Sequence, residues 1–279
     1  MIVVTGASGF IGGAVVAALA RCGASVLAAC RHCVTHDLPV SSVFVDDYSV
    51  LQPPNRDTVL VHLAEPNDIA LAEQRGDAFL AERTASLAQL LNKDWGATVY
   101  ASSAEVYGDS IATLRRTDEP AGARGIYARA KLACEREVVA RGGAVARLGN
   151  VYGPGMPSRN VLSDILRQIP SRGPLTVRNR RPVRDYIWIE DAAEALAMLA
   201  ISRASGIWNI GTGERTSVLG LAQIALALSG QSDRPVVASL QDERESSLVL
   251  DISKTVNALG WRPRTSVAEG IAKLLGPAA

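Results

Sequence analysis

Residues 3–12 read Val-Val-Thr-Gly-Ala-Ser-Gly-Phe-Ile-Gly, and this stretch decides the fold. The two valines belong to a short apolar run, and a segment with apolar residues at helical spacing follows the glycines. Glycines at a strand-to-helix turn let backbone amides and the helix N-terminus approach a pyrophosphate, because no side chain stands in the way. We therefore predict that a dinucleotide binds at this turn, through Gly6, Gly9, Phe10, Ile11 and Gly12.

Short apolar runs continue to alternate with helix-period segments along the chain. This alternation predicts an α/β fold of the Rossmann type, a doubly wound parallel sheet with helices on both faces. Strands are expected near residues 1–5, 25–30, 43–45, 58–62, 97–102, 144–148 and 206–210. Helices are expected near residues 11–22, 69–92 and 126–141.

The pattern changes after about residue 150, where glycine and proline break the chain into short pieces. We expect a smaller, discontinuous C-terminal lobe that binds the substrate. The predicted dinucleotide-binding domain spans residues 1–152 plus about 184–212. The predicted substrate lobe spans about 153–183 and 213–279.

The charge composition argues against a nucleic acid or an anionic membrane as the partner. The chain has 279 residues, 48% of them apolar, and its 29 basic and 28 acidic residues leave a formal net charge of +1. Such a balance provides no excess positive field for a nucleic acid or an anionic membrane. The sequence shows no basic leader and no apolar run long enough to span a bilayer, so we expect a cytoplasmic protein.

The cysteines, Cys22, Cys30, Cys33 and Cys134, are too few for a disulfide framework. Cys30 and Cys33, with His32 between them and His36 nearby, have the spacing of half a zinc or redox site. No second Cys/His pair follows at a suitable spacing, so the sequence favours incidental thiols and no bound metal.

The end of the second predicted strand bears on the choice of dinucleotide. An acidic residue there binds the 2′-hydroxyl of NAD, whereas an arginine accommodates the 2′-phosphate of NADP. Arg31 follows this strand and no acid does, which favours NADP(H), with NAD(H) the alternative if Arg31 is simply solvated. Asp46 and Asp47, after the third strand, are candidates to accept a hydrogen bond from the adenine amino group, or are ordinary loop acids.

Tyr127 and Lys131 are four residues apart in a predicted helix, which places both on one face. A phenol titrates near pH 10, and a neighbouring ammonium favours its phenolate, so the pair is suited to proton exchange with a carbonyl or alcohol. Ser102 and Ser103 end the fifth predicted strand, at the edge where such folds bind ligands. A serine hydroxyl there is a candidate to hold the reacting oxygen, or is a simple strand-end cap.

With these motifs in place, the chain resembles the extended short-chain dehydrogenase/reductase family, which contains nucleotide-sugar epimerases, dehydratases and reductases. The similarity extends over nearly the whole sequence. Besides the glycine turn and the Tyr-x-x-x-Lys helix, it includes His62-Leu63-Ala64, Ser102 to Gly108, Asn150 to Pro154, Val183 to Ile187, Glu190-Asp191, Asn209 to Gly213 and Leu259 to Pro263.

The resemblance implies roles for the matching residues. Ser103 would position the sugar oxygen, Tyr127 would be the acid/base, and Lys131 would hold the nicotinamide ribose and tune Tyr127. Leu63 and Ala64 would line the cofactor site. The residues implied to contact a nucleoside-diphosphate sugar are Ser103, Ala104, Glu105, Asn150, Arg184 and, more weakly, Arg244. Further candidates to contact the substrate phosphates are Arg159, Arg180 and Arg181. Each of them is otherwise simply solvated.

Three departures from the family pattern narrow the reaction. The 4,6-dehydratases of the family carry an Asp-Glu pair after the catalytic Ser/Thr, whereas this chain has Ala104 and Glu105. Water elimination by that route therefore lacks its acid, and Glu105 is left to contact substrate, transfer a proton or form a structural bond. Near the position where the family usually has an Asn, this chain has Glu82 or Arg83. After Leu63-Ala64, where the family usually has small residues, it has Glu65-Pro66.

The sequence thus predicts an enzyme that uses NADPH to reduce the keto group of a nucleoside-diphosphate 4-keto-6-deoxy sugar. The first alternative is an NAD-dependent nucleotide-sugar 4-epimerase, which uses the same residues. The second is a non-catalytic NADP-binding sensor. By resemblance, the helices near 69–92 and 126–141 are those that many family members use to form a homodimer.

Overall fold

Seven parallel strands form the central sheet of the computed structural model, which describes residues 1–31, 40–66, 68–109 and 114–276. Their order is β11-β6-β5-β4-β1-β2-β3, and every neighbouring pair is parallel. The predicted Rossmann-type α/β fold is therefore confirmed. The strands are β1 (Ile2–Thr5), β2 (Val26–Cys30), β3 (Ser41–Phe44), β4 (Val59–His62), β5 (Ala97–Ser103), β6 (Ala144–Leu148) and β11 (Gly206–Ile210).

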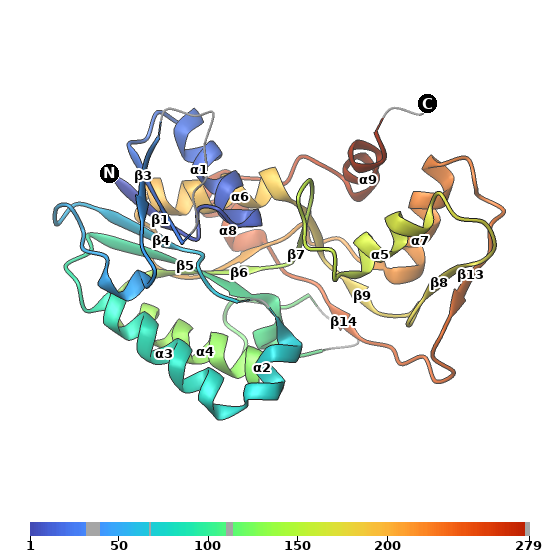
Figure 1. The fold of residues 1–279 in the computed structure, drawn as a ribbon, viewed down its shortest axis with the longest axis horizontal. Helices are drawn as coiled ribbons and strands as arrows, with labels where there is room; N and C mark the ends of the chain where they lie inside the picture. Colours follow the sequence, from blue (N-terminus) through green and yellow to red (C-terminus); the bar gives the residue numbers. More distant parts are fainter. Residues whose placement is uncertain (32–39, 67, 110–113, 277–279) are drawn as a thin grey trace.

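Helices cover both faces of this sheet, because successive strand residues point to opposite sides. In β1, Val3 packs into one apolar cluster and Val4 into another. Figure 1 shows α1 and α6 above the sheet and α3 and α4 below it. The bounds are α1 (Phe10–Arg21), α3 (Asp77–Leu91), α4 (Gly125–Ala140), α6 (Ile189–Ile201) and α8 (Ser253–Leu259), the last of which packs beside β11.

The chain reverses its direction of winding between β1 and β4. From β1 the sheet grows outward through β2 and β3, and then on the other side through β4, β5 and β6. Parallel strands end at the same edge, so Thr5, His62 and Ser103 lie along one rim of the sheet. Ligands of such folds bind outside this rim at the point of reversal.

One predicted helix differs from the structure. The segment expected as a single helix near 69–92 forms two, α2 (Ile69–Arg75) and α3, with Gly76 between them at a φ of 58°. Left-handed backbone of this kind interrupts the helical hydrogen bonds, and glycine adopts it without steric cost. Two short 3-10 turns, η1 (Tyr48–Val50) and η2 (Ala104–Tyr107), follow β3 and β5.

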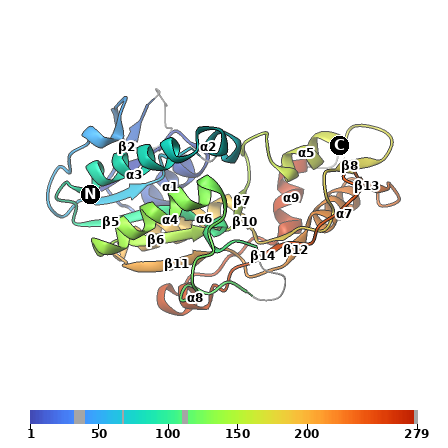
Figure 2. The same ribbon diagram turned by 90° about the horizontal axis from the view of Figure 1, so that it is seen from below.

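A smaller group of elements packs around its own apolar cluster at one end of the sheet, on the right in Figure 1 and again in Figure 2. Short strand pairs connect it to the sheet. The exact division into two lobes stays a prediction. The elements are β7 (Asn150–Tyr152), α5 (Val161–Gln168), β8 (Leu175–Val177), β9 (Val183–Arg184), β10 (Tyr186–Trp188), β12 (Thr216–Ser217), α7 (Val218–Leu228), β13 (Val236–Ala238), β14 (Ser247–Leu248) and α9 (Val267–Leu275).

Across the part of the chain that the structure describes, no helix has the length and apolar character that crossing a bilayer requires.

Candidate active site

The glycine turn brings the end of β1 against the end of β4. Gly6 has a φ of 67°, and a Cβ added there would lie 2.9 Å from the Cα of Ala64. The Thr5 hydroxyl is hydrogen-bonded to Nδ1 of His62 (2.8 Å) and accepts from the Leu63 amide (3.2 Å). These bonds fix the two strand ends at the mouth of the crevice. The predicted residues Leu63 and Ala64 thus lie beside the loop that carries Gly6.

Helix α1 begins directly after this turn. Its N-cap is Gly9, which offers no side chain to bond the first amides of the helix. A Cβ on Gly12 would lie far inside van der Waals contact distance of the Gly6 carbonyl oxygen, whereas one on Gly13 would have ordinary contact, 3.7 Å from the Ala7 oxygen. The turn is thus a tight backbone cradle at a helix N-terminus, the arrangement that binds phosphate groups.

Gly12→Ala is therefore expected to lower the free energy of unfolding by about 1–3 kcal/mol, the usual range for overpacking, and to weaken dinucleotide binding. The matched control is Gly13→Ala in the same helix, which should be neutral or stabilise the protein by about 0.5–1 kcal/mol. Urea unfolding and NADPH fluorescence titration measure both effects. Equal behaviour of the two variants would contradict a tightly packed loop.

Next to the glycine turn lies a cavity of about 330 Å³ that gathers several of the predicted cofactor residues. Arg31 follows β2 and is exposed, and Asp46 and Asp47 follow β3. The residues that line the cavity are Arg31, Asp46, Asp47, Tyr48, His62, Ala64, Glu65, Pro66, Glu82, Arg83, Ser86 and Leu87.

Asp47 and Arg83, two charged residues of this cavity, differ in their hydrogen bonds. Asp47 accepts hydrogen bonds from the amide and hydroxyl of Ser49, which keep the pKa of its carboxyl below the ordinary value. Arg83 is paired with Glu82, but its buried Nε has no hydrogen-bond partner among the described residues. An unsatisfied buried donor is costly, so Arg83 is suited to an anionic or polar ligand in the cavity.

The structure distinguishes the two serines that end β5. Ser102 is buried and donates a hydrogen bond to the carboxylate of Glu135 (2.5 Å), so it belongs to the packing between α4 and the sheet. Ser103 is partly exposed, and its Oγ accepts from the Glu105 amide at 3.2 Å. The hydroxyl hydrogen of Ser103 therefore remains for another acceptor.

Helix α4 carries Tyr127 and Lys131 one turn apart. The ammonium of Lys131 donates to the carbonyl of Ala101 (2.9 Å), two residues before Ser103, and this bond ties the helix to the end of β5. Tyr127 is half-buried and contributes to the electrostatic field at Lys131. The structure thus holds Lys131, one turn after Tyr127, against the end of the strand that carries Ser103.

Beyond Ser103 lies a cluster of charged side chains. Arg184 forms an ion pair with Asp109 (3.2 Å) and donates to the Ser246 hydroxyl (3.0 Å). Burial raises the pKa of the nearby Glu105; the Arg184 charge opposes this shift and the Asp109 charge adds to it. Ala104 between Ser103 and Glu105 is buried and packs against apolar residues.

The other predicted substrate residues lie at varying distances from this cluster. Asn150 is exposed and its strand β7 pairs with β10, where its partner is Tyr186, two residues after Arg184. Arg244 is exposed two residues before Ser246, and its carbonyl accepts a hydrogen bond from Asn179. Asn150 is thus close to Arg184 along the strands, whereas the guanidinium of Arg244 has no bond that links it to the cluster among the described contacts.

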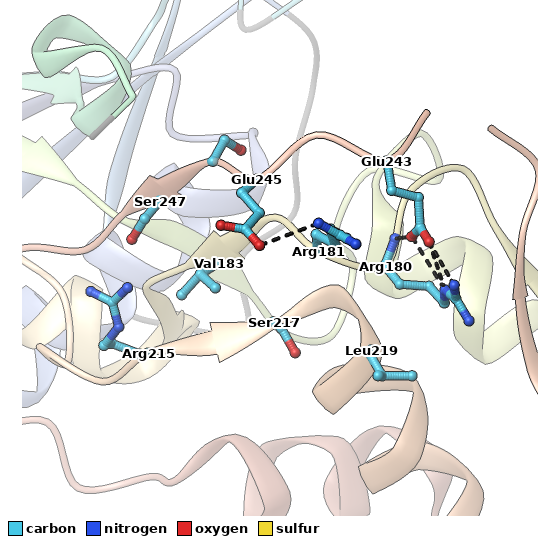
Figure 3. Close-up of a pocket in the computed structure, with 10 residues that line it drawn as sticks. Arg180, Arg181, Val183, Arg215, Ser217, Leu219, Glu243, Glu245 and Ser247 are labelled. Atoms are coloured by element: carbon cyan, nitrogen blue, oxygen red, sulfur yellow. Dashed lines mark hydrogen bonds and ion pairs between the residues drawn. The ribbon is translucent and has the colours of Figure 1, made fainter. Parts of the chain in front are cut away.

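Two further candidate arginines pair with carboxylates. Arg180 and Arg181 pair with Glu243 and Glu245 at 2.6 and 3.3 Å, at the wall of a cavity of about 500 Å³ that Ser246, the partner of Arg184, also lines. Figure 3 shows these pairs together with Val183, which turns into this cavity. Arg159 lines a third cavity, beside the start of α5.

Most of the cysteine spacing considered as half a metal site lies outside the described residues. Cys30 ends β2 with its thiol directed to the Ala28 carbonyl at 3.6 Å. Cys33, His32 and His36 lie outside the described residues. No cluster of three or more His, Cys, Asp or Glu with the geometry of a metal site occurs within the described ranges.

The structure adds two residues to the site that the sequence did not assign, Glu65 and Arg83. Glu65 is the first residue beyond the His-Leu-Ala segment and forms an ion pair with Lys131 at 2.7 Å. Both residues depart from the family pattern, which was the available signal, but the partner of Glu65, Lys131, lies far away in sequence.

Comparisons with known proteins agree with this geometry. The family model described as "NAD dependent epimerase/dehydratase family" matches residues 2–211. A dTDP-6-deoxy-L-talose 4-dehydrogenase (NAD(P)(+)) of Kitasatospora kifunensis is 27% identical, and the match covers 98% of this chain and 94% of that protein. A dTDP-L-rhamnose 4-epimerase of Burkholderia thailandensis is 32% identical over 47% of this chain and 38% of its own length.

A solved structure, MoeE5 in complex with UDP-glucuronic acid and NAD, superimposes with a TM-score of 0.83 and 26% identity. The match covers 97% of this chain and 96% of that one.

Proposed function

The chain belongs to the NAD-dependent epimerase/dehydratase family, and from this premise we propose that it uses NADPH to reduce a nucleoside-diphosphate 4-keto-6-deoxy sugar at C4. One observation carries the proposal. Lys131, one turn after Tyr127, is bonded to the strand that ends at Ser103, while the buried Ala104 stands in the sequence where the dehydratases carry their acid. The site can exchange a proton with a sugar oxygen, but it lacks that acid for expelling a hydroxyl group.

The residues present fit a bound dinucleotide. The cradle leaves no room for a Cβ at Gly6 or Gly12, and the buried Nε of Arg83 lacks a partner in the adjoining cavity among the described residues. When bound there, NADPH supplies the hydride for C4. Arg31, Asp46 and Asp47 would surround its adenosine end, with Lys131 at the nicotinamide ribose.

The reduction assigns a distinct task to each catalytic side chain. Ser103 donates its free hydroxyl hydrogen to the C4 oxygen and fixes its position. Tyr127 transfers its phenolic proton to that oxygen as the carbonyl becomes a secondary alcohol. Lys131 stabilises the phenolate that remains on Tyr127 until solvent returns a proton.

The substrate diphosphate would bind at Arg184. A planar guanidinium can meet two phosphate oxygens at once, and Asn150 lies on the neighbouring strand pair. Asp109 now holds Arg184, so binding exchanges an exposed carboxylate for a phosphate. Glu105, with its raised pKa, is placed to contact the sugar beside them.

The full-length similarity to a 4-dehydrogenase of a 6-deoxy sugar supports hydride transfer at C4, because oxidation of a C4 alcohol is the reverse of the proposed reduction. The test is mass analysis of the sugar product and of any nucleotide released on denaturation. A product heavier by two hydrogens than the keto substrate supports the reductase, whereas unchanged substrate mass rejects it.

A nucleotide-sugar 4-epimerase is the second candidate, favoured by the 32% identity to a dTDP-L-rhamnose 4-epimerase over 47% of this chain. It would use the same Ser103, Tyr127 and Lys131 with no net consumption of dinucleotide. Tightly bound NAD released on denaturation, together with a product of unchanged mass and inverted C4, would establish it instead.

We also propose that NADP(H) is preferred over NAD(H), through Arg31. Arg31→Ala should weaken NADPH binding by about tenfold to a hundredfold, since a hydrogen bond to a charged group contributes about 1.5–3 kcal/mol. NADH binding should stay within about twofold, because NADH has no 2′-phosphate. Fluorescence titration measures both affinities, with Arg21→Ala, an exposed arginine at the end of α1, as control. Equal losses for the two dinucleotides would contradict the assignment.

We keep the homodimer as a proposal. The helices concerned, α3 and α4, pack against each other on one face of the sheet.

A further inference from the structure

Glu65 lies in an unusual place for a carboxylate, enclosed directly beside the catalytic lysine. Its side chain is 8% exposed and its Oε2 stands 2.7 Å from the ammonium of Lys131. The phenol of Tyr100 donates to the same oxygen at 2.7 Å, and the thiol of Cys134 lies 3.8 Å from Oε1. Three elements, the loop after β4, strand β5 and helix α4, therefore converge on one carboxylate.

Lys131 is equally enclosed, with a side chain that is 9% exposed. Its ammonium donates to the Ala101 carbonyl and sits 4.9 Å above the centre of the Tyr100 ring. An ammonium removed from water tends to lose its proton unless an opposite charge compensates. Within the described residues, Glu65 is the carboxylate paired with it.

The pKa directions agree with this geometry. Burial by itself would lower the pKa of Lys131, but the charge of Glu65 and the smaller effects of Tyr127, of the hydrogen bond to Glu65 and of Cys134 together outweigh burial and raise it. Burial would likewise raise the pKa of Glu65, and the charges of Lys131 and His62, with hydrogen bonds from Lys131 and Tyr100, outweigh burial and lower it. The pair thus stays ionised across neutral pH, with each charge depending on the other.

We propose that Glu65 is a positioning residue that keeps Lys131 charged and fixed at the nicotinamide ribose and at Tyr127. The proposal rests on the proposed function only in taking Lys131 as the lysine that serves the dinucleotide. The family's usual small residue at this position would leave Lys131 without this counter-charge. In this chain the lysine is instead clamped from the sheet side by Glu65 and the Ala101 carbonyl.

The contact with Glu65 affects the protonation of Lys131 at alkaline pH. Without the Glu65 charge, Lys131 loses its proton at lower pH. This loss removes the charged form of Lys131 that the proposal places at the nicotinamide ribose and at Tyr127. The titratable and charged groups around Lys131 are Glu65, His62, Tyr100, Tyr127, Cys134 and, through His62, Arg83.

The decisive variant is Glu65→Gln, which keeps the shape of the side chain and removes its charge. We expect the alkaline limb of the pH profile for NADPH binding to move about one to three pH units lower, the usual effect of losing an opposite charge at this distance. NADPH affinity near neutral pH should fall less than affinity at alkaline pH, and at pH values above both limbs each pH unit of displacement weakens binding about tenfold. Fluorescence titration of NADPH across pH measures this without any sugar.

Three comparison variants separate positioning from simple stabilisation. Glu137→Gln removes a carboxylate from the outer side of the same helix, where it pairs with Arg141, and should leave the profile in place. In a Lys131→Met background, Glu65→Gln should cause no further displacement, because no ammonium remains to respond. Glu65→Asp, which retains the charge, should return most of the alkaline binding.

The outcomes are distinguishable. A Glu65→Gln profile that superimposes on the wild type, with only a lower melting temperature, would overturn the proposal and leave Glu65 a packing residue. A displacement that persists in the Lys131→Met background would also overturn it. If no keto-sugar is reduced, the proposed function fails, whereas the NADPH-binding profile still reports on Glu65.

Discussion

Tyr127→Phe is expected to lower kcat for keto-sugar reduction by about 10²- to 10⁴-fold, the usual contribution of a general acid. The substitution removes one hydroxyl group and retains the aromatic ring. That ring lies beside Ala72, Phe79 and Ala130 in a small apolar cluster, so the fold should be preserved. Steady-state kinetics with a proven substrate measures the loss.

The control for this variant is binding. NADPH affinity and the urea midpoint of Tyr127→Phe should stay close to those of the wild type, because the phenol makes no hydrogen bond on which the described structure depends. Turnover that survives the substitution would contradict the mechanism. A wild-type protein that binds NADPH yet reduces no sugar would favour the non-catalytic sensor.

Arg147→Met is expected to lower the free energy of unfolding by about 3–5 kcal/mol, the cost of leaving a buried charge without its partner. Arg147 on β6 and Glu135 on α4 are 3% and 2% exposed, and their closest atoms are 2.6 Å apart. The guanidinium also lies 4.5 Å from the ring centre of Tyr107. The pair anchors the helix that carries Tyr127 and Lys131 to the sheet.

The matched variant for this prediction is the double substitution Arg147→Met with Glu135→Leu. Replacing both charges by apolar side chains should recover part of the stability lost by the single change, because no unpaired carboxylate remains. Urea unfolding gives each free energy. A single substitution that costs under about 1 kcal/mol, or a double that recovers nothing, would show that the pair contributes little.

Local sequence patterns were enough to predict the sheet and the helix that carries Tyr127 and Lys131. The glycine turn at residues 3–12 and the four-residue spacing of Tyr127 and Lys131 are read within one element, where backbone geometry alone relates the residues. The break at Gly76 was missed because a single glycine inside a helical pattern costs only about 1 kcal/mol and is often tolerated.

Contacts between distant segments could not be predicted in the same way. Glu65 stands out in the sequence as a departure from the family pattern, but its pairing with Lys131 depends on β4, β5 and α4 converging at one edge. The choice between Ser102 and Ser103 likewise depends on Glu135, which occupies the first hydroxyl and leaves the second. Tertiary packing decides these partners, and no spacing within the chain encodes them.

The most direct test of the central claim is NADPH oxidation, followed by absorbance, with purified protein and a panel of nucleoside-diphosphate 4-keto-6-deoxy sugars. Our account predicts oxidation that depends on one of these sugars and consumes one NADPH for each alcohol formed. No oxidation with any sugar, together with bound NAD in the purified protein, would contradict the reductase and favour the epimerase.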